Sequence, residues 1–508
     1  MSRPSTLQDP PSLFEPGRNC WKVGTAEKFE LIVDGAAYFI ALREALIQAQ
    51  SQVLLIGWDF DLEIEMRPGE SDGDGNAPDG YPNKVIDFIE AVVDEKPNLK
   101  IYLLRWSGSA VIAPGRFVPA VRLKLAGPDR IKLALDGRHP VGACHHQKIV
   151  VVDDRLAFCG GIDVTDARWD TPEHTPDDPH RVLRNGDPAP PWHDVTTAVT
   201  GPAARKLGDL ARARWHRATD QELAAPDLPA HDIWPASLSV SCHDIAAAIS
   251  RTHPPEDDRA LVNEIEKMVM DAIASAKYLI YIESQYFASD AITQALSVRL
   301  REDGGPDVIV INPVRAENGF EDDAMHVTRT RMVEDLQAAD HEDRFRIWSP
   351  VNAGEDPIYV HAKVCVIDDR SLRVGSSNVD RRSMGFDTEC DLTIEAQDDA
   401  TRQIIARLRN DLLAEHLDCT SEELERKIDQ TGRILTAIEA LNPDKGRGLR
   451  PLELQEDNGA GAFFANTRLF DPRFDRGTPK RRVLTSRHIA FGAAALVAAG
   501  LLYRYWRR

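Results

Sequence analysis

Short apolar runs alternate with amphipathic helical patterns along most of this chain, an arrangement typical of strands that alternate with helices. A helix predicted over residues 36–50 opens a first series, and one predicted over 262–276 opens a second. The apolar runs that follow predict strands at residues 53–60, 99–106 and 130–136 in the first series, and at 278–287, 307–313 and 344–349 in the second. This repeated order favours α/β layering, with a mixed or largely parallel sheet in each half.

Local composition divides the chain further. Residues 70–82 are rich in Gly and Asp and predict a loop, whereas 398–417 and 421–441 carry helical patterns. The proline-rich stretch 226–235 is the expected seam between the two halves. The segments that we predict are a polar lead-in at 1–19, an N-terminal half at 20–230, a C-terminal half at 231–442, a linker at 443–480 and a basic, hydrophobic tail at 481–508.

One eight-residue pattern occurs twice. The chain reads HQKIVVVD from His146 to Asp153 and HAKVCVID from His361 to Asp368, so both copies follow the form HxKxxxxD. The two histidines are 215 residues apart, and each copy opens a β-branched run that leads into a Gly-rich stretch. Two copies in the same surroundings predict two copies of one structural unit, each delivering a His and a Lys to a shared site.

The spacing within each copy has a physical meaning. Residues two apart in a strand point to the same face, so Lys148 should project beside His146 and Lys363 beside His361. Two imidazoles and two ammonium groups in one pocket form an anion site with an acid and a base, which suits phosphodiester chemistry. The aspartate that ends each copy has the opposite parity, and we expect it to play a structural role.

Composition limits the function classes. The chain has 508 residues and a net charge of −20, which disfavours nucleic-acid binding because that binding depends on phosphate neutralisation by Lys and Arg. Its seven cysteines are scattered and odd in number, so we expect a reducing compartment and no zinc site. The N-terminal residues contain no apolar segment of a secretory signal peptide.

The C-terminal residues differ from the rest of the chain. Residues 479–508 carry seven Lys or Arg and no acid, and they include fifteen apolar or small residues at 489–503. A helix of that length is about 22 Å long, short of the roughly 30 Å hydrocarbon core, although snorkelling arginines and interfacial aromatic residues would extend it. We expect a membrane anchor at the cytoplasmic face, attracted to anionic lipid. A basic helix on the membrane surface and a buried terminal helix are the alternatives.

Further motifs accompany the two copies in a fixed order. The chain reads GGIDVTDARWD at 160–170, PWHD at 191–194, IESQYF at 282–287, IYVHAK at 358–363, GSSNVDRRS at 375–383 and DTE at 387–389. These sequences resemble the GGID…RWD, PWHD, IENQYF and GSxNxxxRS blocks of plant- and animal-type enzymes of the phospholipase D superfamily. The resemblance covers about residues 20–420.

The resemblance implies two similar α/β/α sandwich halves packed about a pseudo-twofold axis, with the active site at their seam. It also implies a two-step reaction without a catalytic metal. One histidine attacks phosphorus while the other protonates the leaving alcohol, and water or another alcohol then attacks the phosphohistidine. In the family the nucleophile usually comes from the first motif, which assigns His146 as nucleophile and His361 as general acid and base. The residues alone do not break this symmetry.

The same resemblance, together with the chemistry, predicts the supporting residues. Lys148 and Lys363 would stabilise the phosphoryl oxygens as charge builds, and Asn378 would donate an amide hydrogen bond to them. Asp194 and Glu389 occupy matching positions in the two halves. We expect their carboxylates to bind the far ring nitrogen of the catalytic histidines, which fixes the tautomer.

Three further polar residues receive other assignments. Asp163 stands where the second half has Asn378, and an ionised carboxylate cannot donate a hydrogen bond to phosphate, so we expect a structural role for it. His145 has the opposite strand parity to its catalytic neighbour and should point away from the site. His193 either lines the site or makes a structural hydrogen bond.

The leading prediction is a phospholipase D that hydrolyses glycerophospholipids, such as phosphatidylcholine, to phosphatidate and free headgroup, with transphosphatidylation as a side activity. A cardiolipin-synthase-like phosphatidyltransferase, a phosphodiester nuclease and a non-enzymatic membrane-bound binding protein are the alternatives. Expected partners are a phospholipid bilayer or anionic lipid surface and a water or alcohol acceptor, with no nucleic acid and a monomeric chain. The chemistry is expected to require no cofactor, and calcium stimulation stays open.

Overall fold

The computed structural model describes residues 11–109, 116, 119, 122–123, 127–229, 231–256, 258–315, 319–454 and 471–474. The predicted tail at 481–508 lies outside the described residues. In the part of the chain that is described, no helix combines the length and the apolar character needed to cross a membrane.

Helices and strands alternate in both halves. The N-terminal half contains β1 (Lys22–Val33), α1 (Gly35–Gln48), β2 (Gln52–Gly57), α2 (Val85–Glu95), β3 (Lys100–Trp106), β4 (Ile131–Asp136), β5 (Ile149–Val152), β6 (Leu156–Gly160), β7 (Trp192–His193), β8 (Val195–Thr200) and α5 (Pro202–Thr219). The C-terminal half contains β9 (Cys242–His253), β10 (Val262–Asn263), α6 (Glu264–Ser275), β11 (Leu279–Ser284), α7 (Asp290–Leu300), β12 (Asp307–Ile311), α8 (Gly319–Ala339), β13 (Phe345–Val351), β14 (Tyr359–Val360), β15 (Lys363–Ile367), β16 (Ser371–Gly375), α9 (Arg381–Gly385), β17 (Glu389–Glu395), α10 (Asp399–Leu417), α11 (Ser421–Thr431), α12 (Ile434–Leu441) and β18 (Gly448–Pro451).

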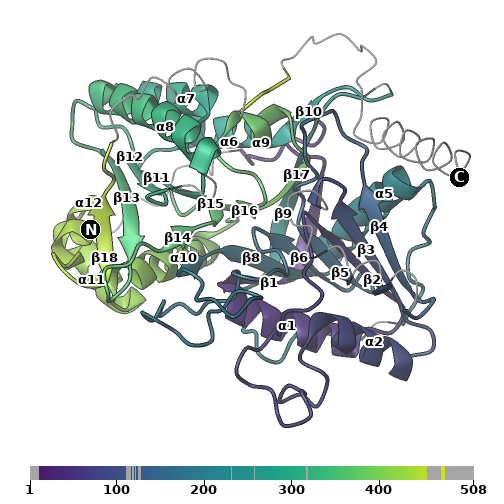
Figure 1. The fold of residues 1–508 in the computed structure, drawn as a ribbon. Coiled ribbons are helices and arrows are strands. Elements are labelled where there is room, and N and C mark those ends of the chain that lie inside the picture. Colours follow the sequence, from purple (N-terminus) through teal and green to yellow (C-terminus); the bar gives the residue numbers. More distant parts are fainter. Residues whose placement is uncertain are drawn as a thin grey trace, which may run out of the picture.

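Apart from β7 and β14, which pair with each other, the strands of both halves form one continuous sheet whose centre is an antiparallel pair, β1 and β9 (Figure 1). Read outward from this pair, the first half runs β1-β8-β6-β5-β2-β3-β4 and the second runs β9-β17-β16-β15-β11-β12-β13. In each half the three outer strands of this order are parallel to one another. The same order on both sides of an antiparallel centre is a pseudo-twofold arrangement, which confirms the predicted fold class.

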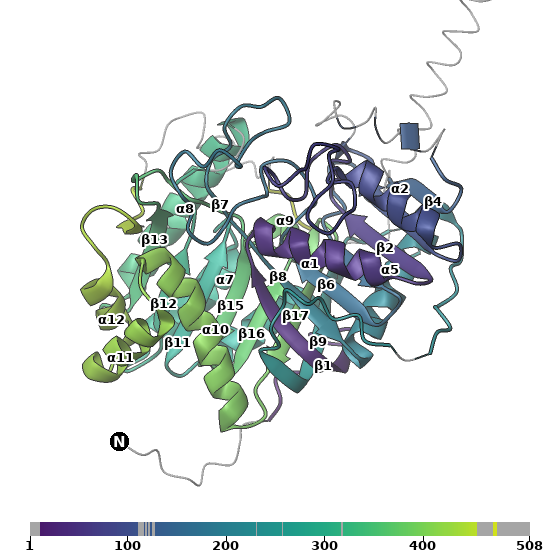
Figure 2. The ribbon, with the colours of Figure 1, turned by 90° about the horizontal axis from the view of Figure 1, so that it is seen from below.

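Each half has three layers because alternate strand residues face two different cores. In β2, Val53 and Leu55 pack into the core under α1 and α2, whereas Leu54 and Ile56 belong to the core that α5 covers. In the second half α6, α7 and α8 cover one face of the sheet and α10 lies on the other (Figures 1 and 2). The core that contacts α5 and α10 contains residues of both halves, so the two units share one interior.

Two sequence predictions differ from the structure. The helix predicted over 421–441 is two helices, because Gly432 adopts a left-handed conformation (φ 72°) that ends α11. The predicted linker at 443–480 contains β18, which pairs antiparallel with β13 at the edge of the sheet. Four residues are too short a run to show a strand period, which explains why β18 was not predicted.

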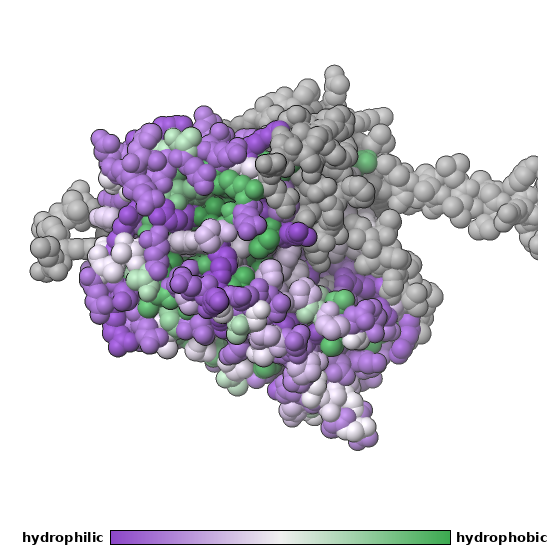
Figure 3. Space-filling model, turned by 60° about the vertical axis from the view of Figure 1, so that its left-hand side comes forward, coloured by the Kyte–Doolittle hydropathy of each residue, from purple (hydrophilic) through white to green (hydrophobic). Residues whose placement is uncertain are grey.

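On the side of the molecule that carries β18 and α12, hydrophobic residues gather in a hollow that hydrophilic residues surround (Figure 3).

The aspartates that end the two motif copies fix equivalent turns. The Asp153 carboxylate accepts the backbone N–H groups of residues 50–52 at 2.7, 2.9 and 2.7 Å. The Asp368 carboxylate accepts those of residues 277–279 at 2.6, 2.7 and 2.9 Å. Each aspartate therefore joins its own hairpin turn to the start of the neighbouring strand, β2 or β11. Among the described residues, neither carboxylate is hydrogen-bonded to His146 or His361, whose ring nitrogens contact Glu389 and Asp194 instead.

We expect Asp153→Ala to destabilise the fold by about 2–4 kcal/mol, because three backbone donors lose a charged, buried acceptor. A lower urea midpoint of unfolding, followed by circular dichroism, would show this loss. Asp129→Ala removes a fully exposed carboxylate and serves as the matched control. Equal midpoints for the two variants would contradict the structural role of Asp153.

Candidate active site

The first motif histidine is held by the opposite half of the molecule. The backbone N–H of His146 donates to the Thr388 carbonyl at 2.9 Å, and the backbone N–H of Thr388 donates to the Cys144 carbonyl at 3.0 Å. These bonds place His146 Nδ1 3.0 Å and 3.1 Å from the two carboxylate oxygens of Glu389. Because β5 begins only at Ile149, His146 lies in an extended segment before the strand, not in the strand as the sequence predicts.

The second motif histidine repeats this arrangement with the halves exchanged. Strand β14 pairs in parallel with β7, and the His361 N–H donates to the His193 carbonyl at 2.7 Å. His361 Nδ1 lies 2.6 Å from Asp194 Oδ2. Each imidazole is therefore oriented by a carboxylate from the other half. Since Nδ1 is engaged in both rings, Nε2 is the nitrogen available for chemistry.

The two motif lysines turn back toward their own histidines. Lys148 Nζ donates to the His146 carbonyl at 3.3 Å and lies 3.0 Å from Asp163 Oδ2. Lys363 Nζ donates to the His361 carbonyl and, at 3.3 Å, to Gln285 Oε1. The side chains of both lysines are almost wholly buried.

The equivalent residues Asp163 and Asn378 have different surroundings. Asp163 forms an ion pair with Lys148 and accepts the Trp58 N–H at 3.2 Å. Asn378 is 4% exposed, and its backbone N–H donates to Ser383 Oγ at 3.0 Å. Its side-chain Oδ1 is buried and has no hydrogen-bond partner among the described residues. One half thus supplies a charge-neutralising carboxylate where the other supplies a neutral amide.

Burial controls the protonation of the site. It lowers the pKa of both motif histidines well below the usual value, and the lysine of the same motif lowers it further, Lys148 for His146 and Lys363 for His361. Burial also lowers the pKa of Lys363 to about 7 and raises that of Asp194 to about 7. Lys363 also lowers the pKa of His146, and Lys148 lowers that of His361, so each histidine responds to the lysine of the opposite half and the two motif copies form one electrostatic site. Neutral imidazoles in the resting site suit a nucleophile.

Several residues of the site were not assigned a role from the sequence. Ser376 Oγ and Ser383 Oγ donate to the two oxygens of Glu389 at 2.5 and 2.8 Å, which fixes that carboxylate. The Arg168 guanidinium stacks over the Trp192 ring, with Cζ 3.8 Å from the ring centroid. Burial and Lys363 are the two largest causes of the lowered pKa of His361, and the charge of Arg168 is the third. All four lie inside the quoted motif blocks, so the blocks carried the signal but not the role.

The two other histidines near the motifs, His145 and His193, make contacts of their own away from the rings of His146 and His361. His145 is fully buried, with Nε2 3.4 Å from Gln147 Oε1, and burial lowers its pKa to about 3. His193 is fully buried, with Nε2 2.9 Å from Glu283 Oε2.

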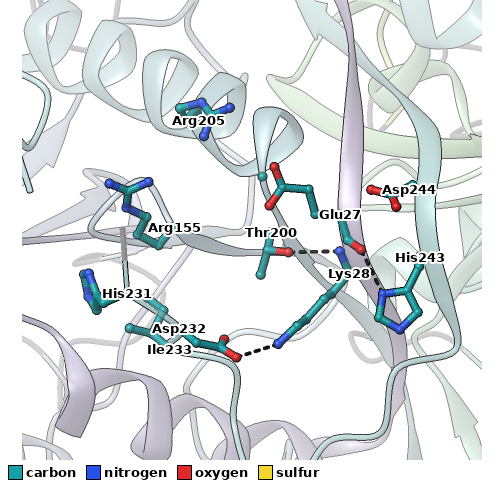
Figure 4. A pocket seen from close by; sticks show the side chains of 11 residues that line it. Glu27, Lys28, Arg155, Thr200, Arg205, His231, Asp232, Ile233, His243 and Asp244 are labelled. Carbon is teal, nitrogen blue, oxygen red and sulfur yellow. Dashed lines mark hydrogen bonds and ion pairs between the residues drawn. The ribbon is translucent and has the colours of Figure 1, made fainter. Parts of the chain in front are cut away.

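A separate polar pocket lies at the opposite end of the central strands from Asp194. Figure 4 shows Lys28 of β1 pointing toward Asp232 of the segment between the halves, with Nζ 2.7 Å from Oδ2. Thr200, which lines this pocket, ends β8, whereas Asp194 precedes the start of that strand. The pocket therefore contains no member of the motif pair.

Two family models match overlapping parts of the chain. One, described as "Phospholipase D", matches residues 136–293, and another, described as "Cardiolipin synthase, PLD-like domain", matches residues 269–412. Together they contain both motif copies and both orienting carboxylates. The chain belongs to the phospholipase D superfamily.

The chain is similar in sequence to curated phospholipases D and in fold to a solved structure. It is 22% identical to phospholipase D1 of Schizosaccharomyces pombe over 84% of this chain and 38% of that protein. It is 26% identical to phospholipase D alpha 1 of Arabidopsis thaliana over 47% of this chain and 44% of that protein. The chain thus spans less than half the length of these relatives. Its fold resembles that of phosphatidylserine synthase from Haemophilus influenzae, with a TM-score of 0.52 and 14% identity over 76% of this chain and 86% of that chain.

Proposed function

We propose that this superfamily member is a phospholipase D that hydrolyses a glycerophospholipid, such as phosphatidylcholine, to phosphatidate and free headgroup. The observation that carries the proposal is the pair of buried imidazoles, each oriented by a carboxylate of the opposite half and each accompanied by a motif lysine. Membership of the superfamily and its phospholipase D relatives support this chemistry.

The geometry supports a two-step exchange at phosphorus. His146 Nε2 attacks the phosphorus atom, forming a P–N bond, while the P–O bond to the headgroup breaks and His361 gives its proton to the departing oxygen. The negative charge of the bound phosphodiester favours the protonated form of His361, which this step requires. His361 then takes a proton from water, which attacks phosphorus and releases His146. An alcohol in place of water gives transphosphatidylation, and the motif lysines stabilise the phosphoryl oxygens in both steps.

One assay tests the proposal. Purified full-length chain is incubated with phosphatidylcholine vesicles with and without ethanol, and separately with single-stranded DNA, with His146→Asn protein as the control. Phosphatidate, and phosphatidylethanol when ethanol is present, are the expected products. Cleavage of DNA with inert lipid would instead favour a nuclease and contradict the proposal.

A phosphatidyltransferase is the second candidate, because one of the matching family models is described as cardiolipin synthase. It differs only in the acceptor, a lipid alcohol in place of water. Vesicles of phosphatidylglycerol without ethanol separate the two, since a transferase would form cardiolipin and glycerol, whereas a hydrolase would form phosphatidate.

We propose that the basic tail at 481–508 holds the enzyme at an anionic lipid surface. The support is charge, because residues 479–508 contain seven Lys or Arg and no acid. Deletion of residues 480–508 should release most of the protein from sedimented anionic vesicles. Hydrolysis of a soluble phosphodiester should be unchanged. Equal sedimentation of the shortened and complete chains would contradict this role.

Activity should fall as the pH rises above about 7, because the pKa of Lys363 is lowered to about 7 and its ammonium charge is lost above that value. The measurement is kcat/KM for a soluble phosphodiester as a function of pH, which reports groups of the free enzyme. Lys363→Arg keeps its charge at every accessible pH, so its remaining activity should extend to higher pH. An alkaline limb at the same pH in both proteins would contradict the assignment.

A further inference from the structure

A second cluster of histidines and carboxylates lies buried behind the catalytic residues. It consists of Asp34, between β1 and α1, His174 and His193 of the first half, and Glu415 of α10. The side chains of these four residues are at most 6% exposed. Three come from the first half and one from the second, so the cluster joins the two halves.

The four side chains present their ligand atoms to one point. His174 Nε2 and His193 Nδ1 lie 3.0 and 2.8 Å from Glu415 Oε1. The same nitrogens lie 3.6 and 3.4 Å from the carboxylate oxygens of Asp34. A tetrahedral zinc ion with bonds of about 2.0–2.1 Å has ligand atoms about 3.3 Å apart. The four measured distances lie on both sides of that value.

The outer nitrogen of each histidine is also engaged. His174 Nδ1 lies 2.9 Å from Asp170 Oδ2, and His193 Nε2 lies 2.9 Å from Glu283 Oε2. A carboxylate that accepts the proton of the outer nitrogen leaves the inner nitrogen with a lone pair. Histidines that bind metals are held in this way almost without exception.

Two buried atoms of the cluster lack a hydrogen bond. Asp34 Oδ2 and His193 Nδ1 have no hydrogen-bond partner among the described residues, although both residues are fully buried. His193 Nδ1 is close to Glu415 Oε1 but is not aligned for a hydrogen bond with it. Buried atoms that lack a hydrogen bond and lie close to the other ligand atoms of the cluster are what a central cation would require.

We propose that Asp34, His174, His193 and Glu415 bind one divalent transition-metal ion, and that zinc fits the set of two imidazoles and two carboxylates best. Four protein ligands leave no open position, so the ion would be structural and would brace the two halves. Asp34 also accepts the Asp194 N–H at 3.0 Å, and Asp194 orients His361. The ion would thus position the second catalytic histidine without contacting the substrate, and the proposal does not depend on which substrate is hydrolysed.

Metal content and cobalt spectroscopy test this proposal. The full-length chain is purified, exposed to zinc, dialysed against metal-free buffer and analysed by inductively coupled plasma mass spectrometry. About one zinc per chain is expected. Glu415→Gln and His174→Gln should retain less than a tenth of that amount, whereas His243→Gln, which removes an exposed histidine, should retain all of it.

A second measurement needs no variant. Cobalt bound to the wild-type chain should give the visible absorption bands of a tetrahedral ion, and X-ray absorption at the zinc edge should show two imidazole ligands. Wild-type protein that holds no zinc after exposure, and whose melting temperature a strong chelator does not change, would overturn the proposal. The cluster would then be a network of two imidazolium ions and carboxylates. Zinc that all three variants retain equally would be surface-bound and would overturn it as well.

Discussion

Replacement of His146 by asparagine should lower kcat for a phosphodiester by about 10⁴-fold or more, because it removes the group assigned to form the covalent intermediate. Replacement of His361 should lower kcat for a lipid substrate by about 10²–10⁴-fold, the usual range for losing a general acid and base. The structure gives both rings the same type of partner, a buried carboxylate at Nδ1, which does not identify the nucleophile. The leaving group provides a way to distinguish them.

A p-nitrophenyl phosphodiester has a leaving group that departs without a proton. With this substrate, His361→Asn should still release a burst of p-nitrophenolate equal to the enzyme concentration and should accumulate a phosphorylated protein. His146→Asn should release no burst. Acid-labile phosphate mapped to residue 146 by mass spectrometry would complete the assignment.

The reverse result has a clear meaning. A burst from His146→Asn and none from His361→Asn would make His361 the nucleophile and His146 the acid, since the pseudo-twofold site allows either. His243→Gln, far from the catalytic pair on the exposed surface, is a control that should keep full activity. Turnover by both catalytic variants at the wild-type rate would rule out the histidine mechanism altogether.

The duplicated motif was sufficient to predict two copies of one structural unit with a shared site, whereas the pseudo-twofold packing of two sandwich halves was predicted from the family resemblance. It was not sufficient to predict how the halves interlock. Parity places Lys148 beside His146, but nothing in the local pattern indicates that Glu389 orients His146 while Asp194 orients His361. That exchange follows from pairing between segments more than 160 residues apart.

The proposed metal cluster shows the same limit more strongly. Zinc motifs are recognised in a sequence when their ligands are closely spaced in pairs. Here the ligands Asp34, His174, His193 and Glu415 are single residues spread over most of the chain. Only the packing of α10 against the first half brings Glu415 to the histidines. The sequence therefore predicted no zinc site, and the structure alone suggests one.

Glu389→Gln should lower kcat by about 10²–10⁴-fold while leaving the fold intact, because the substitution changes the proton on His146 and little else. The carboxylate accepts hydrogen bonds from Ser376, Ser383 and His146 Nδ1. A glutamine has one acceptor oxygen and an amide that donates, so it cannot accept from all three donors. The imidazole is expected to move its proton to Nε2, which removes the lone pair that attacks phosphorus.

The loss should appear in the first chemical step. Rapid-quench measurements with the p-nitrophenyl substrate should show a burst that is slower in Glu389→Gln, whereas Asp194→Asn should retain the burst and slow the hydrolysis that follows it. Glu395→Gln, at the other end of β17, changes the same type of residue away from the catalytic pair and is the matched control. If Glu389→Gln and Glu395→Gln gave equal bursts, Glu389 would be a packing residue and the tautomer of His146 would be set by another group.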